Sequence, residues 1–279
     1  MPENNSPILE FKDVCLQFGE KWALKNISLT LKPGETRIIF GAAGSGKTML
    51  LKAVVGLIPV DSGEIRLFGN PVTSMREQEL YALRSRAGFL FQEGGLFDSL
   101  TIGENVEYPL LNRQAEDGKD HQVSNGDAEK RVREALRFVE LEQTFNQFPS
   151  EVSGGMRRRV GIARAIVTEP PLVLYDSPTA GLDPITANTI MALIAKERDM
   201  RNSASLIVTH RYQDGEIMAN FRYQGEELQP VGDGPESKKL ETRTKFIVMK
   251  DGEIVFFGTR QELESSKDDY VRKFIRKET

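Results

Sequence analysis

The 279-residue sequence predicts an α/β fold with a parallel-sheet core, an N-terminal antiparallel β region and a helical subdomain. Three observations support this prediction. Apolar runs of strand length recur along the chain, one of them leads into a glycine-rich turn and a helix, and helical patterns dominate residues 75–160. Hydrophobic residues make up 39% of the chain, which supplies a core and excludes wholesale disorder.

Strand patterns mark both ends of the chain. Residues 8–32 alternate loosely between apolar and polar side chains, with Gly19 as a break, so we expect an antiparallel β region there. Residues 65–68 predict a further strand that ends in a turn. Residues 246–257 contain two apolar runs around Asp251-Gly252, the pattern of a β-hairpin.

The middle of the chain predicts the sheet core and its helices. Residues 36–40 indicate a short buried strand, and residues 48–57 indicate the helix after the glycine-rich turn. Residues 172–175 and 206–208 are apolar runs typical of buried parallel strands. Residues 129–141 carry apolar side chains on one face, as an amphipathic helix does.

Two polar segments interrupt these patterns. Residues 112–127 predict an exposed loop, and residues 224–243, which are charged and contain three glycines, predict a flexible, exposed insertion. We therefore expect one domain over residues 8–263, with the helical subdomain at about 75–160 and a C-terminal tail at 264–279.

Composition excludes several classes of function. The net charge of −4 gives no basis for nucleic-acid binding, and no nucleic-acid partner is expected. Cys15 is the only cysteine, which excludes an intrachain disulfide, and His121 and His210 are too few for a histidine-rich metal centre. Without an 18-residue apolar run or a secretion-signal pattern, we expect neither a membrane span nor export.

One motif carries specific chemistry. The phosphate-binding pattern G-x-x-x-x-G-K-[ST] is formed by Gly41, Ala42, Ala43, Gly44, Ser45, Gly46, Lys47 and Thr48. Its glycines let several backbone N–H groups turn toward phosphate oxygens, and the following helix adds its positive end. Lys47 can contact the β and γ phosphates, and the Thr48 hydroxyl can bind Mg²⁺. The motif therefore predicts nucleotide binding.

Two further segments are candidates for the same nucleotide site. Asp176 ends the apolar run 172–175 and could hold Mg²⁺ at the sheet edge, although such a residue alone is more often part of a turn. Ser153, Gly154 and Gly155 open a predicted helix. They form either a second anion-binding end or an ordinary helix cap.

Together these motifs resemble the ATP-binding subunits of ABC transporters, over about residues 8–263. The matching positions, in family order, are the loop 41–48, Gln92, Ser153 to Met156, Asp176, Ala180 to Asp183, and His210. The resemblance implies a P-loop NTPase core, ATP and Mg²⁺ as cofactors, and an ATPase that yields ADP and phosphate.

The resemblance also implies roles for single residues at the nucleotide. Phe18 would stack on adenine, with an ordinary core aromatic as the alternative. Thr48, Asp176 and Gln92 would surround the Mg²⁺ ion, and Gln92 would also couple the site to the membrane subunit.

Other implied roles concern partners. Ser153, Gly154 and Gly155 would close over the γ-phosphate from an opposite subunit, while Asp183 resembles the D-loop aspartate and His210 the switch histidine. The expected partners are a second ATPase subunit, identical or paired, and an integral-membrane permease. The chain would then lie in the cytoplasm, at the inner face of the cell membrane.

A narrower resemblance concerns residues 91–110, around Gln92. Residues 91–97, 100–106 and 108–110 are similar to ATPases of lipid-trafficking ABC systems that serve MCE-domain proteins, and Met156 fits that subgroup. It implies lipid transport, with an MCE-domain protein as a further partner.

One position departs from the family pattern. The family places a glutamate after the strand-end aspartate, as the base that polarises the attacking water, whereas this chain has Ser177. A hydroxyl can orient water but cannot accept its proton at neutral pH, and general-base catalysis typically contributes ~10²–10⁴ in rate. The catalytic residues implied here are Ser177, His210 and Gln92, with slow turnover expected.

Two alternatives remain beside an ATPase that drives a permease. The first is a nucleotide-gated binding subunit with little hydrolysis. The second is a soluble ABC ATPase of translation or DNA repair, which the single phosphate loop and the lack of a long coiled-coil insertion disfavour.

Overall fold

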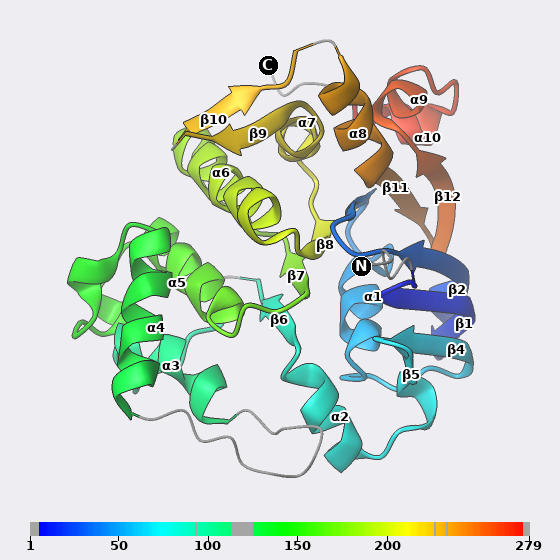
Figure 1. Cartoon of the computed structure of the whole chain (residues 1–279). Helices are drawn as coiled ribbons and strands as arrows, with labels where there is room; N and C mark the ends of the chain where they lie inside the picture. Colours follow the sequence, from blue (N-terminus) through cyan, green and yellow to red (C-terminus); the bar gives the residue numbers. More distant parts are fainter. Residues whose placement is uncertain (1–5, 93, 113–124, 226, 233, 276–279) are drawn as a thin grey trace.

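The computed structural model describes residues 6–92, 94–112, 125–225, 227–232 and 234–275. Its centre is a six-stranded sheet of order β12-β11-β3-β8-β7-β6, in which only β12 runs antiparallel to its neighbour (Figure 1). A second, antiparallel sheet of order β2-β1-β4-β5 lies beside it. The predicted α/β class is therefore confirmed.

The strands are β1 (Leu9–Phe18), β2 (Lys21–Leu31), β3 (Thr36–Gly41), β4 (Ser62–Leu67), β5 (Asn70–Pro71), β6 (Ala87–Leu90), β7 (Leu172–Asp176), β8 (Ala204–Val208), β9 (Phe221–Gln224), β10 (Glu227–Pro230), β11 (Thr244–Lys250) and β12 (Glu253–Gly258). The helices are α1 (Lys47–Val54), α2 (Glu77–Arg84), α3 (Ile102–Leu111), α4 (Asn125–Phe138), α5 (Gly154–Ile166), α6 (Pro184–Arg201), α7 (Tyr212–Asn220), α8 (Pro235–Arg243), α9 (Arg260–Glu264) and α10 (Asp269–Arg272).

Successive side chains along the strands of the six-stranded sheet point alternately into two separate hydrophobic cores. Leu172 and Leu174 of β7 point into the core shared with α1 and the antiparallel sheet. Val173 and Tyr175 point the other way, into the core shared with the helices α3 to α7. The inner strands are buried on both faces, which explains their continuous apolar runs.

One buried polar pair crosses two of these strands. The hydroxyls of Thr36 on β3 and Ser205 on β8 lie 3.0 Å apart in a hydrogen bond, and the two residues are directly paired in the sheet. Both residues are fully enclosed, with exposed fractions of 0% and 3%.

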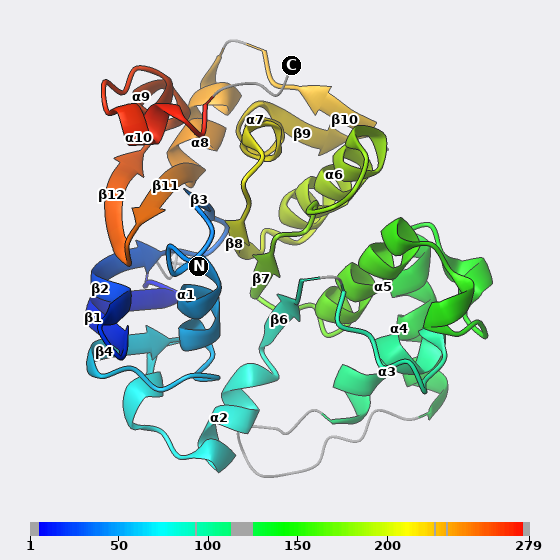
Figure 2. The same ribbon diagram turned by 180° about the vertical axis from the view of Figure 1, so that it is seen from behind.

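The predicted helical subdomain contains α2, β6, α3, α4 and the start of α5. Helices α3, α4 and α5 pack on one another at the side of the molecule away from α1 (Figure 2). Most of the loop expected at residues 112–127 lies outside the described residues, and α4 already begins at Asn125. None of the helices in the described ranges is both long and apolar enough to cross a lipid bilayer.

The segment at residues 224–243, expected as a flexible, exposed insertion, contains regular secondary structure in the part that the structure describes. Strands β9 and β10 form a small sheet, and α8 follows. Arg198 of α6 donates to the carbonyl oxygen of Phe221 at 2.8 Å, and Asp199 accepts from the backbone N–H of Tyr223 at 2.9 Å. Polar contacts anchor the segment, so hydrophobic periodicity did not reveal it.

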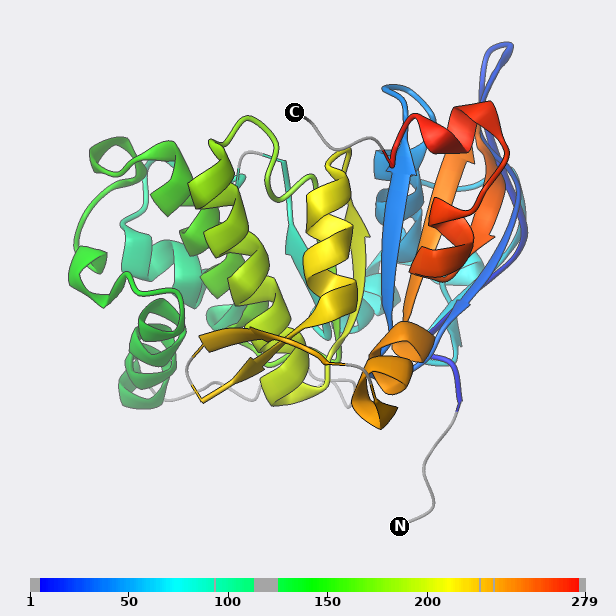
Figure 3. The same ribbon diagram turned by 90° about the horizontal axis from the view of Figure 1, so that it is seen from above.

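Two smaller boundaries also differ from expectation. Helix α1 ends at Val54 rather than at residue 57, because Gly56 adopts φ +64°, outside the helical region. The expected C-terminal tail folds back on the domain, where Leu263 of α9 and Val271 of α10 are buried. Figure 3 shows this segment, in red, beside β11 and β12.

Candidate functional site

The phosphate-binding pattern forms the turn between β3 and α1. Gly46 precedes the helix with φ +102°, and a Cβ built on it would lie 2.0 Å from the carbonyl oxygen of Ala23. Both the backbone angle and this close approach require glycine. The loop is therefore held against β2 while the N-terminal end of α1 faces the space above it.

Lys47 lies over the loop that precedes it. Its Nζ atom donates to the carbonyl oxygens of Gly41 at 2.7 Å and Ala42 at 2.8 Å. Burial lowers the pKa of Lys47, while the nearby carboxylate of Asp176 raises it. The structure therefore brings the loop cation and the strand-end carboxylate into one site.

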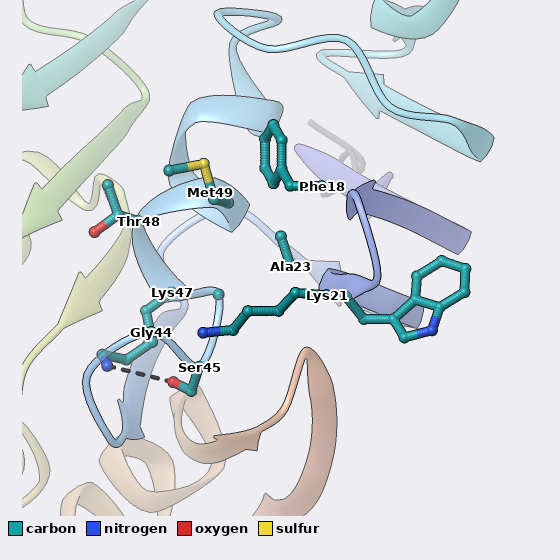
Figure 4. Close-up of a pocket in the computed structure, with 10 residues that line it drawn as sticks. Phe18, Lys21, Ala23, Gly44, Ser45, Lys47, Thr48 and Met49 are labelled. Atoms are coloured by element: carbon teal, nitrogen blue, oxygen red, sulfur yellow. Dashed lines mark hydrogen bonds between the residues drawn. The ribbon is translucent and has the colours of Figure 1, made fainter.

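A cavity of about 410 Å³ opens beside the loop. Phe18, at the end of β1, lies across from Ser45 and Lys47, and 54% of its surface is exposed (Figure 4). An exposed ring disfavours the core-aromatic alternative, because a core aromatic would be enclosed. The cavity is lined by Phe18, Lys21, Trp22, Ala23, Gly44, Ser45, Gly46, Lys47, Thr48 and Met49.

Lys21, which also lines this cavity, is not among the residues that the sequence motifs predict. Its Nζ atom points toward the loop and lies 3.2 Å from the position that a Cβ on Gly44 would take (Figure 4). The β1–β2 turn brings it there. No pattern distinguishes this lysine from other surface lysines in the sequence, so only the fold reveals a second cation at the loop.

Asp176, Ser177 and His210 lie where neighbouring parallel strands end. Asp176 closes β7 and is buried, and His210 is exposed shortly after β8. Asp176 pairs with Val208 in the sheet, and the backbone N–H of Ser177 donates to the carbonyl oxygen of Val208 at 3.0 Å. Carboxyl ends of adjacent parallel strands are where open α/β sheets bind ligands.

The second predicted anion-binding end lies in a different cavity. Ser153 caps α5, with its Oγ atom accepting from the backbone N–H of Met156 at 3.2 Å. Gly154, Gly155 and Asp183 line the same cavity of about 570 Å³. Asp183 caps α6 by accepting from the N–H groups of Ile185 and Thr186, both at 3.0 Å. A hydrogen bond with the Thr186 side chain, together with these backbone hydrogen bonds, lowers the pKa of Asp183.

The comparisons with known proteins all indicate the same family. The family model for ABC transporters matches residues 24–180, more than half of the chain. The chain belongs to the ABC transporter family of ATP-binding proteins. Its fold and reaction class are those of an ABC ATPase.

Individual relatives extend this result. The intermembrane phospholipid transport system ATP-binding protein MlaF of Escherichia coli is 32% identical, covering 99% of this chain and 91% of the relative. MlaF of Haemophilus influenzae is 30% identical, covering 97% and 99%. The methionine import ATP-binding protein MetN of Rhizobium johnstonii is 38% identical, but over 74% of this chain and 55% of that protein.

Solved structures agree in fold. A dimeric ATP-binding cassette, MJ0796, in a post-hydrolysis state with ADP and Pi superposes with a TM-score of 0.73 at 30% identity, covering 90% of this chain and 98% of that one. CbiO1 of Clostridium perfringens, part of the ABC transporter complex CbiONQ, gives a TM-score of 0.73 at 25% identity, covering 96% and 94%.

In this ABC ATPase the residues expected around Mg²⁺ are oxygen donors. Thr48 offers a hydroxyl at the start of α1, Asp176 a carboxylate beside Lys47, and Gln92 an amide oxygen beyond the end of β6. Mg²⁺ prefers oxygen ligands and keeps several waters, so one carboxylate and one hydroxyl beside a triphosphate suit it. The donor set therefore fits this ion.

Gln92 is exposed and directly follows Phe91, which lines an aromatic groove of the ABC ATPase. The groove, about 490 Å³, lies between β6, α2 and α3. Phe91, Phe97 and Tyr108 all expose more than a third of their surface there. Phe97 and Tyr108 pack with their ring centroids 4.9 Å apart, and the Arg164 guanidinium lies 5.8 Å from the Phe97 ring.

Ser177 has an unusual local geometry. Its φ is +52°, in the left-handed region that L-residues rarely adopt, and its hydroxyl donates to Asp176 Oδ1 at 3.3 Å. Buried Arg158 of α5 donates to the carbonyl oxygens of Ser177 and Ala180, at 3.1 and 3.2 Å. The backbone at this position is thus fixed by α5, and the side chain supplies a neutral hydroxyl.

Proposed function

We propose that this chain is the ATPase subunit of a transporter that moves lipid, and that two copies act as a dimer beneath a membrane permease. The observation that supports it best is the separation of two anion-binding helix ends. The end of α1 and the end of α5 line different cavities and belong to different parts of the molecule (Figure 1).

Neither cavity alone encloses a triphosphate. Both cavities are partly open to solvent; the first presents the N-terminal end of α1, and the second presents those of α5 and α6. Two chains packed head to tail would place Ser153, Gly154 and Gly155 of one copy against the nucleotide on the loop of the other. A dimer would therefore enclose two ATP molecules, and Asp183 would lie beside the second copy.

Each nucleotide would be held by groups with distinct tasks. Phe18 offers an exposed ring for the adenine, and the N–H groups of the loop with Lys47 take the phosphates. Mg²⁺ would supply charge neutralisation when bound to Thr48 and Asp176, with Gln92 nearby. His210 would contact the γ-phosphate from the end of β8.

The aromatic groove beside Gln92 is where a permease would dock. A helix of the partner could bury Phe91, Phe97 and Tyr108, which are otherwise exposed to water. Its position next to Gln92 would link permease movement to the metal. The chain would then lie at the inner face of the cell membrane, in the cytoplasm.

Lipid is the cargo that the comparisons favour. The two MlaF relatives align with nearly the whole chain, whereas the chain covers about half of the methionine import relative. The MlaF alignments thus include the segments after residue 210, which the ABC family model does not cover. An MCE-domain protein is the further partner that we propose.

A second candidate rests on Ser177. The position next to Asp176 carries a hydroxyl that points to the Asp176 carboxylate, and it cannot accept a proton from water at neutral pH. The subunit would then act by binding ATP, closing and reopening slowly. Turnover measurements on Ser177 variants, given in the Discussion, separate the two candidates.

Sedimentation velocity tests the dimer. We expect monomers without nucleotide and dimers at saturating Mg-ATP. Gly154→Glu should abolish the dimer, because it brings a negative charge to the opposing γ-phosphate while its Cβ meets only the tip of Arg157, at 3.8 Å. Gly126→Glu is the matched control, since a Cβ there meets no atom of the described residues within 4 Å. A monomer at saturating Mg-ATP, both in the wild type and in Ser177→Ala, would contradict the proposal.

A transport assay tests the cargo. The complex with its membrane partner, reconstituted in liposomes, should move a fluorescent phospholipid in an ATP-dependent way and should not move radiolabelled methionine. Transport of methionine but not of phospholipid would refute the lipid assignment while leaving the ATPase assignment intact.

A further inference from the structure

The C-terminal segment, residues 259–275, reaches back to the phosphate loop. The backbone N–H of Ala42 donates a hydrogen bond to the hydroxyl of Tyr270 at 3.2 Å, across 228 positions of sequence. The same hydroxyl donates to the carbonyl oxygen of Met249 on β11 at 3.1 Å. One side chain therefore joins the loop to the neighbouring strand and uses its hydroxyl as both donor and acceptor.

Tyr270 and Lys47 hold the same peptide group. The carbonyl of Gly41 and the N–H of Ala42 belong to one peptide plane; Lys47 Nζ contacts the former at 2.7 Å and Tyr270 contacts the latter. A planar peptide held on both sides cannot rotate without breaking one contact. Tyr270 thus fixes the plane over which Lys47 lies.

The position of Tyr270 is itself determined by its surroundings. Asp268 caps α10 by accepting from the backbone N–H of Tyr270 at 2.7 Å. The Tyr270 ring packs edge-on against Phe274, with centroids 5.3 Å apart. Phe274 in turn stacks with Phe40, the residue before the loop, at 6.3 Å and an angle of 12°. The segment is docked by packing as well as by its one hydroxyl.

The other end of the segment contacts the helix that follows His210. Buried Tyr212 of α7 donates to Glu264 of α9 at 2.5 Å, and its ring lies 6.5 Å from that of Phe40. The segment therefore touches both the phosphate loop and the start of α7. Phe40 lies between these two contacts.

We propose that the C-terminal segment braces the nucleotide site, and that Tyr270 is a positioning residue that orders the phosphate loop for ATP. This inference rests on the proposed role of the loop in ATP binding. With the brace undocked, the Gly41–Ala42 peptide gains freedom that ATP binding must then remove, so affinity falls while the chemical step is preserved.

The test uses the full-length chain with Tyr270→Phe, which keeps the ring and removes the hydroxyl. We expect the KM and the Kd for Mg-ATP to rise about fivefold, as for one lost hydrogen bond, with kcat nearly unchanged. Hydrogen exchange of the Ala42 amide without nucleotide should become faster. Tyr212→Phe, which releases the far end, should shift both readouts in the same direction by less.

Tyr223→Phe, in β9, is the matched control and should leave both readouts at wild-type values. Unchanged ATP affinity and unchanged Ala42 exchange in folded Tyr270→Phe would overturn the brace. A lowered melting temperature of Tyr270→Phe with unchanged ATP affinity would also overturn the proposal, since the Tyr270 hydroxyl would then stabilise the fold without affecting the phosphate loop. Failure of the loop assignment is distinguishable, because Lys47→Ala would then bind ATP normally.

Discussion

Thr179 donates a 2.5 Å hydrogen bond to the buried carboxylate of Asp214, and this contact joins the loop after β7 to helix α7. Thr209 donates to the same oxygen at 2.6 Å, and Arg211 contacts the other oxygen at 3.3 Å. Burial raises the pKa of Asp214, while the two threonine hydroxyls lower it. The loops that carry Ser177 and His210 therefore share one anchor.

Thr179→Val should lower the free energy of unfolding by about 2 kcal/mol, because a buried carboxylate loses a charge-assisted donor. Urea unfolding measures the change. Thr209→Val removes the second donor and should cost a similar amount. A loss below about 0.5 kcal/mol, typical of surface changes, would show that this anchor is not structural.

Lys47→Ala should weaken Mg-ATP binding by about 100-fold, since it removes the loop cation that faces the phosphates. Calorimetric titration of the folded variant measures the Kd. Lys52→Ala, which removes the same charge at the other end of α1, is the control and should bind ATP normally. Unchanged affinity in Lys47→Ala would refute the assignment of the phosphate loop.

Ser177→Glu should raise kcat by at least about 10²-fold, because it restores a carboxylate that can accept the proton of the attacking water. The rate is measured at saturating Mg-ATP with the membrane partner present. Ser177→Gln, of equal size but without charge, should give no increase. If the wild type already has a kcat of about 10 s⁻¹ and Ser177→Glu leaves it unchanged, then the serine does not limit hydrolysis.

Glu197→Gln should stabilise the protein at high pH. Within the described part of the chain neither carboxylate oxygen of Glu197 has a hydrogen-bond partner, and burial raises its pKa to about 7. The folded state thus binds this proton more tightly than the unfolded state does, so wild-type stability falls as pH rises from about 4.5 to 7.

The difference between Glu197→Gln and wild type should therefore be small at pH 5 and reach about 3 kcal/mol at pH 8. Urea unfolding at both pH values measures it. Glu169→Gln, which removes an exposed charge that also lies near Arg201, is the control. A difference in stability that does not grow between pH 5 and pH 8 would show that the pKa of Glu197 is not raised in the folded protein.

Tyr108→Glu should weaken binding to the membrane partner by more than about tenfold, because it places a charge in the aromatic groove that a permease helix would bury. Co-purification and binding in detergent measure the effect, and ATP affinity should stay unchanged. Met200→Glu, at a side chain that is 63% exposed on α6, is the control. Normal assembly of Tyr108→Glu would show that the permease docks elsewhere.

Local signals predicted much of this molecule. The turn after β3, the Ser153 cap and the Asp251-Gly252 hairpin follow from glycine angles, side-chain hydrogen bonds and periodicity, all of which act within a few residues. The hairpin prediction was incomplete in one respect, because β11 also pairs in parallel with β3. That pairing joins segments some 200 positions apart.

The contacts that sequence could not predict are long-range and polar. Lys21 lies near Gly44 because the turn between β1 and β2 is placed beside the phosphate loop. Tyr270 contacts Ala42 because the C-terminal segment folds back onto that loop. Strands β9 and β10 have only four residues each, too few for a periodic pattern. The roles of Phe18, Gln92 and Asp183 at the nucleotide remain predictions.

The buried pair of Thr36 and Ser205 bears on how the chain folds. Strands with two apolar faces can shift by one residue and still bury their side chains, so hydrophobicity alone does not oppose a misaligned sheet. A shift of β3 against β8 would separate these two hydroxyls and leave both without partners in the core, at a cost of about 1–3 kcal/mol each. The pair therefore favours the native alignment of β3 and β8, on which the position of the phosphate-binding loop after β3 depends.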